Sequence, residues 1–194
     1  MAEGPAEDLD ALVRRVDPDR WLSSRFIADP EKRADVVALY AFDYELRRAV
    51  EATTNPIMAE IRLTWWSEAL DEIYAGEAVR RHPVVEAVAT AAGRGGVPRR
   101  LLDGAIDERL SRSADGSIAE AAASVLDRSA DAAAVRALGA AWERQAVDAV
   151  VRTAARKVSA AAFPAIAHVA LVGKARSELA RRVRLTWAVV RGRI

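Results

Sequence analysis

The chain contains no cysteine, which excludes disulfide bonds, thiolate metal sites and a cysteine nucleophile. Histidine is scarce as well, with only His82 and His168, and each lies beside a proline-linked segment rather than in a ligand cluster. A charge excess of either sign is also missing, because 29 basic and 28 acidic residues give a net charge of +1. With no overall positive field, nucleic acid is not an expected partner.

Long apolar runs are absent too. The nearest to an uncharged apolar run, residues 160–173, is interrupted by Pro164 and His168 and falls short of the roughly 18 residues that a membrane span needs. The first residues are acidic, with neither a basic nor an apolar segment, and we expect no signal peptide there. We expect a soluble or peripheral protein, in the bacterial cytoplasm or on the inner face of the membrane, or in the mitochondrial matrix if the source is eukaryotic.

Alanine, leucine and arginine dominate what is present, and alternating β-branched runs are missing, so the composition predicts an all-α fold. We expect one helical-bundle domain over residues 1–194, with residues 1–7 as a flexible N-terminus. Several helices should begin at a proline, with Asp17, Asp29 and Asn55 as N-caps. The predicted helices are 7–16, 18–28, 30–53, 56–75, 83–92, 98–111, 118–126, 130–158, 164–172 and 176–191.

One stripe of the predicted helix 30–53 carries most of the candidate ligand-binding residues. Its members recur at intervals of three and four: Arg33, Val37, Tyr40, Tyr44, Arg47 and Glu51. Such a stripe could line a polar cavity, or it could be a partly exposed face held by an ion pair between Arg47 and Glu51. On the next helix, Arg62 lies one turn before Trp66, so its guanidinium could reach an anion or simply pair with a carboxylate.

Two other patterns give packing expectations. Helix 56–75 is apolar on two sides, which predicts burial between neighbours; one side holds Met58, Ile61, Trp65, Ala69 and Ile73. Residues 113–162 are alanine-rich, which predicts thinner packing or a partner.

The C-terminal helix has an apolar stripe flanked by arginines, made of Leu179, Val183, Trp187 and Val190. This pattern is typical of a helix docked on its own domain. The alternative is peripheral contact with an anionic membrane through residues 176–193.

Several phrases resemble the squalene/phytoene synthase family. They are Leu39-Tyr40-Ala41-Phe42, then the segment 62–70 (RLTWWSEAL), then Ile73, Gly76 and His82-Pro83. Weaker likenesses are Leu138-Gly139 and the tail from Phe163 onward. The resemblance implies an isoprenoid-synthase bundle, shortened, in which enzymes of the family use two aspartate-rich motifs to hold Mg²⁺ against substrate diphosphates.

Aligned on that resemblance, neither metal motif is intact. The first reads Arg47-Arg48-Ala49-Val50-Glu51, and the second retains only Asp148. We therefore expect no catalytic residues, no metal ligands and no cofactor. Mg²⁺ would be needed only if a displaced acidic site supported prenyl transfer, using carboxylates among Glu51, Glu68, Asp71, Glu72, Asp103, Asp107 and Glu108.

The resemblance extends to function. A mitochondrial branch of the family lacks the metal motifs and assists assembly of respiratory complex I. The leading hypothesis is therefore a non-catalytic interaction or assembly factor. Such a pseudoenzyme would bind a protein partner such as a respiratory complex subunit. The alternatives are a prenyl-diphosphate transferase with a displaced acidic site, and a protein that binds an anionic or isoprenoid lipid through its arginines.

Overall fold

The structure is a computed structural model, and it describes residues 8–173 and 177–194. The described residues form ten α-helices and two 3₁₀-helices without a β-strand, which confirms the all-α prediction. The expected flexible segment 1–7 and Arg176 lie outside the described residues. The elements are α1 (Leu9–Val16), α2 (Pro18–Ser24), α3 (Pro30–Glu51), α4 (Pro56–Ala75), α5 (Pro83–Gly93), α6 (Arg99–Ser111), α7 (Ser117–Leu126), α8 (Ala132–Glu143), α9 (Ala149–Ala155), η1 (Phe163–Ala165), η2 (Ala167–Leu171) and α10 (Glu178–Arg191).

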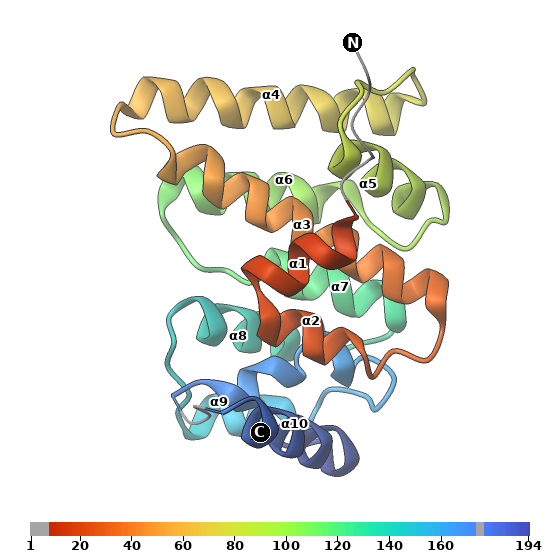
Figure 1. Cartoon of the computed structure of the whole chain (residues 1–194), viewed down its shortest axis with the longest axis vertical. Coiled ribbons are helices and arrows are strands. Elements are labelled where there is room, and N and C mark those ends of the chain that lie inside the picture. Colours follow the sequence, from red (N-terminus) through yellow and green to blue (C-terminus); the bar gives the residue numbers. More distant parts are fainter. Residues whose placement is uncertain (1–7, 174–176) are drawn as a thin grey trace.

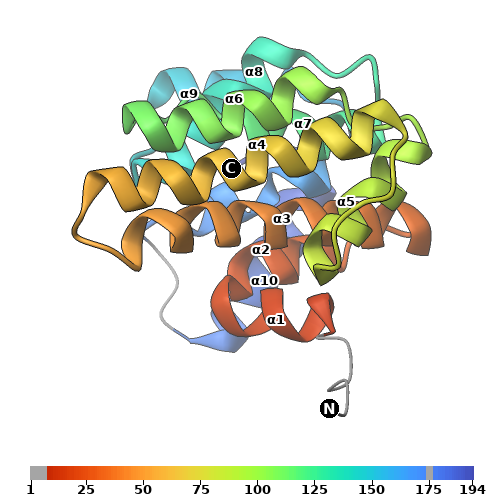
Figure 2. The ribbon, with the colours of Figure 1, turned by 90° about the horizontal axis from the view of Figure 1, so that it is seen from above.

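Helix α3 is the centre of the arrangement. It packs against α1, α2, α4, α5, α6 and α7, and its middle turns are buried almost all round. Helix α4 runs across one end of the long axis, whereas α9 and α10 lie at the opposite end (Figure 1). The view from above shows α1, α2 and α10 on one side of α3 and α6, α8 and α9 on the other (Figure 2). A polar side chain on the middle of α3 therefore meets groups from several distant segments.

The helix starts follow the local chemistry. The side chains of Asp17, Asp29 and Asn55 accept hydrogen bonds from backbone N–H groups of the first turns of α2, α3 and α4, which confirms the three predicted caps. His82 does the same for α5, because its Nδ1 accepts from the N–H of Val84 at 3.3 Å. Helix α4 ends at Gly76, whose φ of +72° is the left-handed conformation that glycine adopts without strain.

Two predicted helices were wrong. The expected helix 130–158 is split into α8 and α9, because Gln145 takes a left-handed φ of +52° and Asp148 caps a new helix. The expected α-helix 164–172 is two short 3₁₀ turns, η1 and η2. Every residue of 163–172 is buried. Packing against the surrounding helices, rather than local helix propensity, therefore determines the conformation of this segment.

The α7 and α8 part of the alanine-rich region packs tightly, contrary to the expectation of thin packing, whereas residues 144–150 are mostly exposed. Residues 116–123 are all buried, and Val135 and Leu138 of α8 are fully enclosed. Alanine and glycine here bring α7 and α8 close together. A Cβ added at Gly139 would lie 2.5 Å from the Cβ of Ala119 and 2.9 Å from the Cα of Gly116. The small residues of α7 and α8 thus allow these two helices to approach each other closely.

Two apolar faces are exposed. The first half of α4 was expected to be buried, yet Met58 and Ile61 are 42% and 56% exposed, because this half of the helix extends beyond its neighbours. The stripe on α10 was expected to dock on the domain, and it also faces outward. Within the described residues, no helix has both the length and the apolar character needed to cross a membrane.

Candidate functional site: a buried arginine between facing carboxylates

The polar centre of the bundle is built on Asp43 of α3. This residue follows directly after Leu39-Tyr40-Ala41-Phe42 and lies on the same helix face as Leu39 and Leu46, so its carboxylate is carried into the core. It is 1% exposed. A carboxylate so deeply buried must be paired and hydrogen-bonded to remain ionised.

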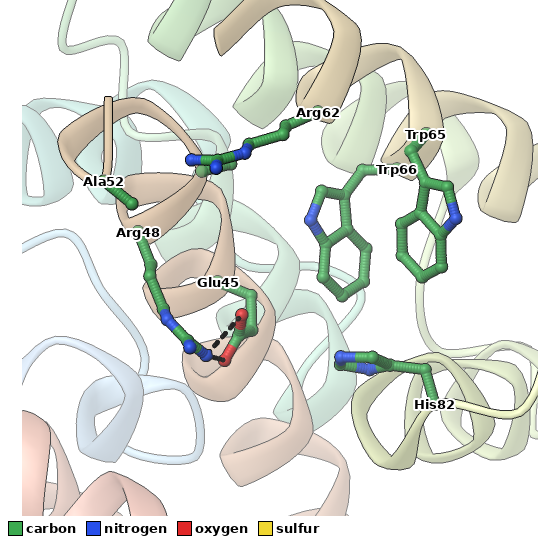
Figure 3. A pocket seen from close by; sticks show the side chains of 8 residues that line it. Glu45, Arg48, Ala52, Arg62, Trp65, Trp66 and His82 are labelled. Carbon is green, nitrogen blue, oxygen red and sulfur yellow. Dashed lines mark hydrogen bonds and ion pairs between the residues drawn. The ribbon is translucent and has the colours of Figure 1, made fainter. Parts of the chain in front are cut away.

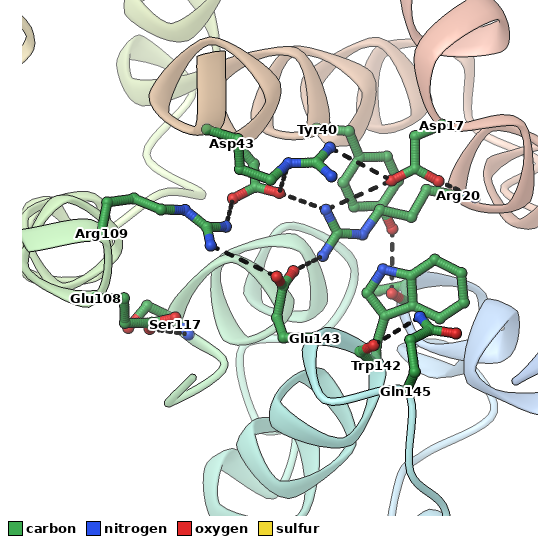
Figure 4. A network of polar contacts seen from close by, with 12 residues as sticks. Asp17, Arg20, Tyr40, Asp43, Glu108, Arg109, Ser117, Trp142, Glu143 and Gln145 are labelled. Carbon is green, nitrogen blue, oxygen red and sulfur yellow. Dashed lines mark hydrogen bonds and ion pairs between the residues drawn. The ribbon is translucent and has the colours of Figure 1, made fainter. Parts of the chain in front are cut away.

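Arg20 of α2 supplies the first partner. Its guanidinium is almost fully buried and donates from Nη1 to Asp43 Oδ2 at 2.5 Å and from Nη2 to Glu143 Oε1 at 3.0 Å. Asp17, one turn earlier on the chain, lies 3.7 Å from Nη1. One guanidinium therefore joins carboxylates from α3, from the end of α8 and from the start of α2 (Figure 4).

Two further arginines complete the network. Arg109 of α6 donates to Asp43 Oδ1 at 2.5 Å and to Glu143 Oε2 at 3.5 Å. Arg47 of α3 lies farther out, with its Nε 3.7 Å from Asp43 Oδ2 and its Nη2 3.9 Å from Asp17 Oδ2. Three positive and three negative groups thus cancel, and both oxygens of Asp43 and of Glu143 face guanidinium groups. We call these six residues the arginine–carboxylate network.

Burial and the ion pairs of the network together shift the pKa values of Asp17, Asp43 and Arg20. Burial alone would raise the pKa of Asp43, but Arg20 and Arg109 outweigh burial and hold that pKa at about 2. Asp17 differs: burial raises its pKa more than Arg20 and the backbone N–H lower it. Arg20 has a raised pKa, because the surrounding carboxylates outweigh the burial that would lower it. The guanidinium is permanently charged.

Aromatic rings close the inner side of the network. Tyr40 donates its hydroxyl to the carbonyl oxygen of Ala165 at 3.1 Å, and Arg20 lies over the Tyr40 ring. His168 of η2 makes edge contacts with Tyr40 and with Trp142, the latter at 4.8 Å between ring centroids. Burial, helped by the charge of Arg20, keeps the pKa of His168 well below its usual value. The imidazole is therefore neutral at physiological pH.

The candidate residues of helix 30–53 lie in different surroundings. Tyr40 is a core residue, whereas Tyr44 is half-buried and Arg33 donates to the carbonyl oxygen of Ile27 at 3.3 Å. Arg47 reaches toward Asp43 and Asp17 rather than toward Glu51. Glu51 is exposed and, with Arg47, lines an open pocket of about 470 Å³. Of these candidates, only Arg47 belongs to the network, and Tyr40 contacts it through its ring, which lies under Arg20.

That pocket, at the mouth of the network, is lined by four arginines and three glutamates: Arg47, Arg109, Arg112, Arg144, Glu51, Glu108 and Glu143. Arg112 follows the C-terminal end of α6 and Arg144 follows that of α8, and both line the pocket beside Arg47. Among the residues that the structure describes, neither has a carboxylate partner. We call these three residues the arginine pocket.

Arg62 and Trp66 belong to a different groove, between α3 and α4. This groove has a volume of about 280 Å³ and is lined by Trp65, Trp66 and His82 on one side and by Glu45 and Arg48 on the other (Figure 3). The rings form an edge-to-face cluster, with Trp66 and His82 centroids 5.1 Å apart. The figure shows Arg62 extending toward α3, where it meets no acid in the described part of the chain. The two histidines belong to separate aromatic clusters.

The donor set does not fit Mg²⁺. This ion needs several free oxygen ligands, but the oxygens of Asp43 and Glu143 are taken by Arg20 and Arg109. Across residues 8–173 and 177–194, no group of three or more acidic or histidine side chains is placed to hold a metal ion. The acids considered for a displaced site are dispersed: Asp71 and Asp103 pair with Arg99, Glu68 and Glu72 with Arg80, and Glu108 accepts from the N–H of Ser117.

Of the six network residues, the sequence predicted only Arg47 as a site residue and Asp17 only as an N-cap. It missed the other four: Arg20, Asp43, Arg109 and Glu143. A signal for one was present, since Asp43 is an acid on the apolar face defined by Leu39 and Leu46, which requires a buried cation. Nothing local identified that cation. Arg20 is 23 residues from Asp43 and 123 residues from Glu143.

The structure is thus an all-α bundle in which Asp43 of the central helix α3 faces Glu143 of α8, with Arg20 between them. A family model for squalene/phytoene synthase matches residues 13–115, more than half of the chain, and the chain belongs to that family. The match covers Asp17, Arg20, Asp43, Arg47 and Arg109, and it ends before Glu143. Comparison with curated proteins and with solved structures finds no match.

Proposed function

We propose that this chain is a non-catalytic member of the squalene/phytoene synthase family that acts by binding a protein partner. The observation that carries the proposal is Arg20, whose guanidinium lies between the carboxylates of two facing helices. In the enzymes of the family, the resemblance places Mg²⁺ between acids of facing helices. A dication about 5 Å from a guanidinium is repelled by roughly 6–7 kcal/mol at an effective dielectric constant near 20.

The specific role that the resemblance implies is assembly of respiratory complex I. An interaction factor needs a stable scaffold with exposed recognition surfaces rather than an ionised diphosphate. The exposed apolar side chains Ile57, Met58 and Ile61 lie in the N-terminal half of α4. They suit such a surface, because contiguous apolar patches on a monomer commonly mark interaction sites.

Gene deletion in the native host tests this role. We expect the deletion to lower NADH–quinone oxidoreductase activity in isolated membranes and the wild-type gene to restore it. Glu51→Gln and Asp148→Asn, which remove the carboxylates remaining at the two motif positions, should restore it equally, because neither has a catalytic task in this account. Both are conservative: Glu51 is exposed, and asparagine replaces aspartate well as an N-cap.

Two results would contradict the assignment. Unchanged oxidoreductase activity after deletion would remove the complex I role. Failure of Glu51→Gln to complement, with the protein present at wild-type level, would show that a motif carboxylate has a chemical task. Ile57→Ser with Ile61→Ser is the matched surface variant, and it should complement poorly if α4 contacts the partner.

A second candidate function, binding of an isoprenoid diphosphate without turnover, is favoured by the arginine pocket. Arg112 and Arg144 line it without carboxylate partners in the described chain, and guanidinium groups bind phosphate oxygens bidentately without a metal. We expect Arg112→Gln with Arg144→Gln to weaken binding of farnesyl diphosphate at least about tenfold in calorimetric titration without Mg²⁺. Arg156→Gln, an exposed arginine of the α9 C-cap, is the control. Equal affinity in all three proteins, or no binding by the wild type, would remove this candidate.

A further inference from the structure

Helix α10 presents an apolar face to the outside of the protein. Its members are Leu179, Val183, Trp187 and Val190, which are 72%, 62%, 57% and 76% exposed. They lie one turn apart along one side of the helix, over a length of roughly 17 Å. We call them the α10 apolar face.

The orientation of α10 is fixed from its opposite side. Leu185 and Ala188 are buried against the bundle, where α10 packs on η2 and α2. Arg184 donates from Nε to the carbonyl oxygen of Ala170, and Arg181 is paired with Asp19 of α2. The outward position of the α10 apolar face therefore follows from how the rest of the helix is anchored.

Arginines border this face on both sides. Arg182, one turn from Glu178, lies along one edge, and Arg191 lies along the other with its guanidinium carbon 3.8 Å from the centroid of the Trp187 ring. Arg193 follows at the end of the helix. Long basic side chains beside an apolar stripe with a tryptophan are the composition of helices that lie in a membrane interface.

Positive charge is concentrated in the C-terminal part of the chain, which contains α10. Residues 149–194 contain ten basic residues and one acidic residue, whereas residues 1–148 contain 19 basic and 27 acidic residues. The net charge of +1 conceals this asymmetry. Helices α9 and α10 both lie at the end of the molecule opposite α4, and Arg152 of α9 lines a surface pocket together with Arg184 and Ile194 (Figure 1).

We propose that the α10 apolar face docks on the surface of an anionic lipid bilayer. Apolar side chains would enter the acyl boundary, and the bordering arginines would meet the lipid phosphates. A second copy of the chain is a poorer occupant, because pairing two such faces would bring arginines against arginines, with Glu178 as the one acid within α10. The proposal does not depend on the proposed assembly role.

Vesicle co-sedimentation of the full chain tests it. Vesicles of phosphatidylcholine alone are compared with vesicles containing about one-third phosphatidylglycerol, at about 0.1 M and about 0.5 M sodium chloride. We expect binding to the anionic vesicles at low salt, weaker binding at high salt and little binding to phosphatidylcholine. Leu179→Ser with Val183→Ser should lower the partition coefficient at least about tenfold.

The matched control is Ile57→Ser with Ile61→Ser, which removes two similarly exposed aliphatic side chains from α4 at the opposite end. It should bind vesicles like the wild type. Trp187→Phe should also bind, but it should lose the blue shift of tryptophan fluorescence that the wild type shows on binding. All these side chains are more than half exposed, so the variants are expected to fold.

Three results would overturn the proposal. One is equal binding to neutral and anionic vesicles, or no binding to either. Another is wild-type binding by the Leu179 and Val183 variant. The third is size-exclusion chromatography in which the wild type is a dimer and that variant a monomer, with no vesicle binding, which would assign the face to a second copy of the chain.

Discussion

Replacing Arg20 by methionine is expected to destabilise the protein by about 3–5 kcal/mol, because Asp43 and Glu143 would lose the cation that compensates their burial. A loss of this size is a large fraction of the stability of an ordinary domain. Urea unfolding followed by circular dichroism measures it. Arg20→Lys should be intermediate, since lysine keeps the charge but cannot bridge two carboxylates with a planar fork.

The control for Arg20 is Arg48→Met, whose pair with Glu45 is at the surface and should contribute at most about 1 kcal/mol. The double variant Arg20→Met with Asp43→Leu should recover much of the loss, because Arg109 and Glu143 can still pair with each other. It also keeps the test usable if Arg20→Met alone does not fold. Equal effects of Arg20→Met and Arg48→Met would show that the network does not stabilise the core.

Stability should fall as the pH drops below about 6.5, and His168 is the expected cause. The pKa of His168 is lowered in the folded protein, chiefly by burial. Below about pH 6.5, His168 is therefore protonated in the unfolded chain but still neutral in the folded protein. Stability is complete above the unfolded pKa and is lost below it, at up to about 1.4 kcal/mol per pH unit. Urea unfolding at several pH values between 5 and about 7.5 measures this slope.

His168→Phe should remove that slope, and the phenyl ring can keep the edge contacts with Tyr40 and Trp142. His82→Asn is the matched control: it removes the other histidine while keeping an acceptor that can cap α5, and it should leave the slope in place. A slope that persists in His168→Phe would mean that another group titrates with unfolding in this range.

The sequence was sufficient for the fold class and for most helix starts, because these depend on neighbouring residues. Proline at the first turn and the caps Asp17, Asp29 and Asn55 determined where α2, α3 and α4 begin. The break at Gln145 was not predictable in the same way, since a left-handed glutamine has no signature in composition. The 3₁₀ segment 163–172 takes its form from the core around it.

Amphipathic patterns were less informative about what covers a face. The stripe of α10 was recognised correctly as one face, but periodicity states only which residues lie together, not whether protein or solvent lies opposite. The same applies to Met58 and Ile61 of α4. The candidate-site prediction had a related difficulty: it grouped residues by helix stripe, whereas the buried centre is assembled from α2, α3, α6 and α8.

The network supports the proposal that this scaffold is stable without a metal ion. In an isoprenoid synthase, the resemblance assigns clustered acids to a divalent ion, and acids left without it would repel one another across the core. Here Arg20 and Arg109 pair with Asp43 and Glu143, and despite burial they hold the pKa of Asp43 below its usual value. The arginines that pair with Asp43 and Glu143 therefore also occupy the oxygens that a metal ion would need at these two residues.

The most direct test of this account is pyrophosphate release by the purified protein incubated with farnesyl or geranylgeranyl diphosphate and Mg²⁺. We predict no release above the rate in buffer, because the carboxylates of the core are held by arginine. Release that depends on Mg²⁺ and is abolished by Asp43→Asn, with the variant shown to be folded, would contradict the account.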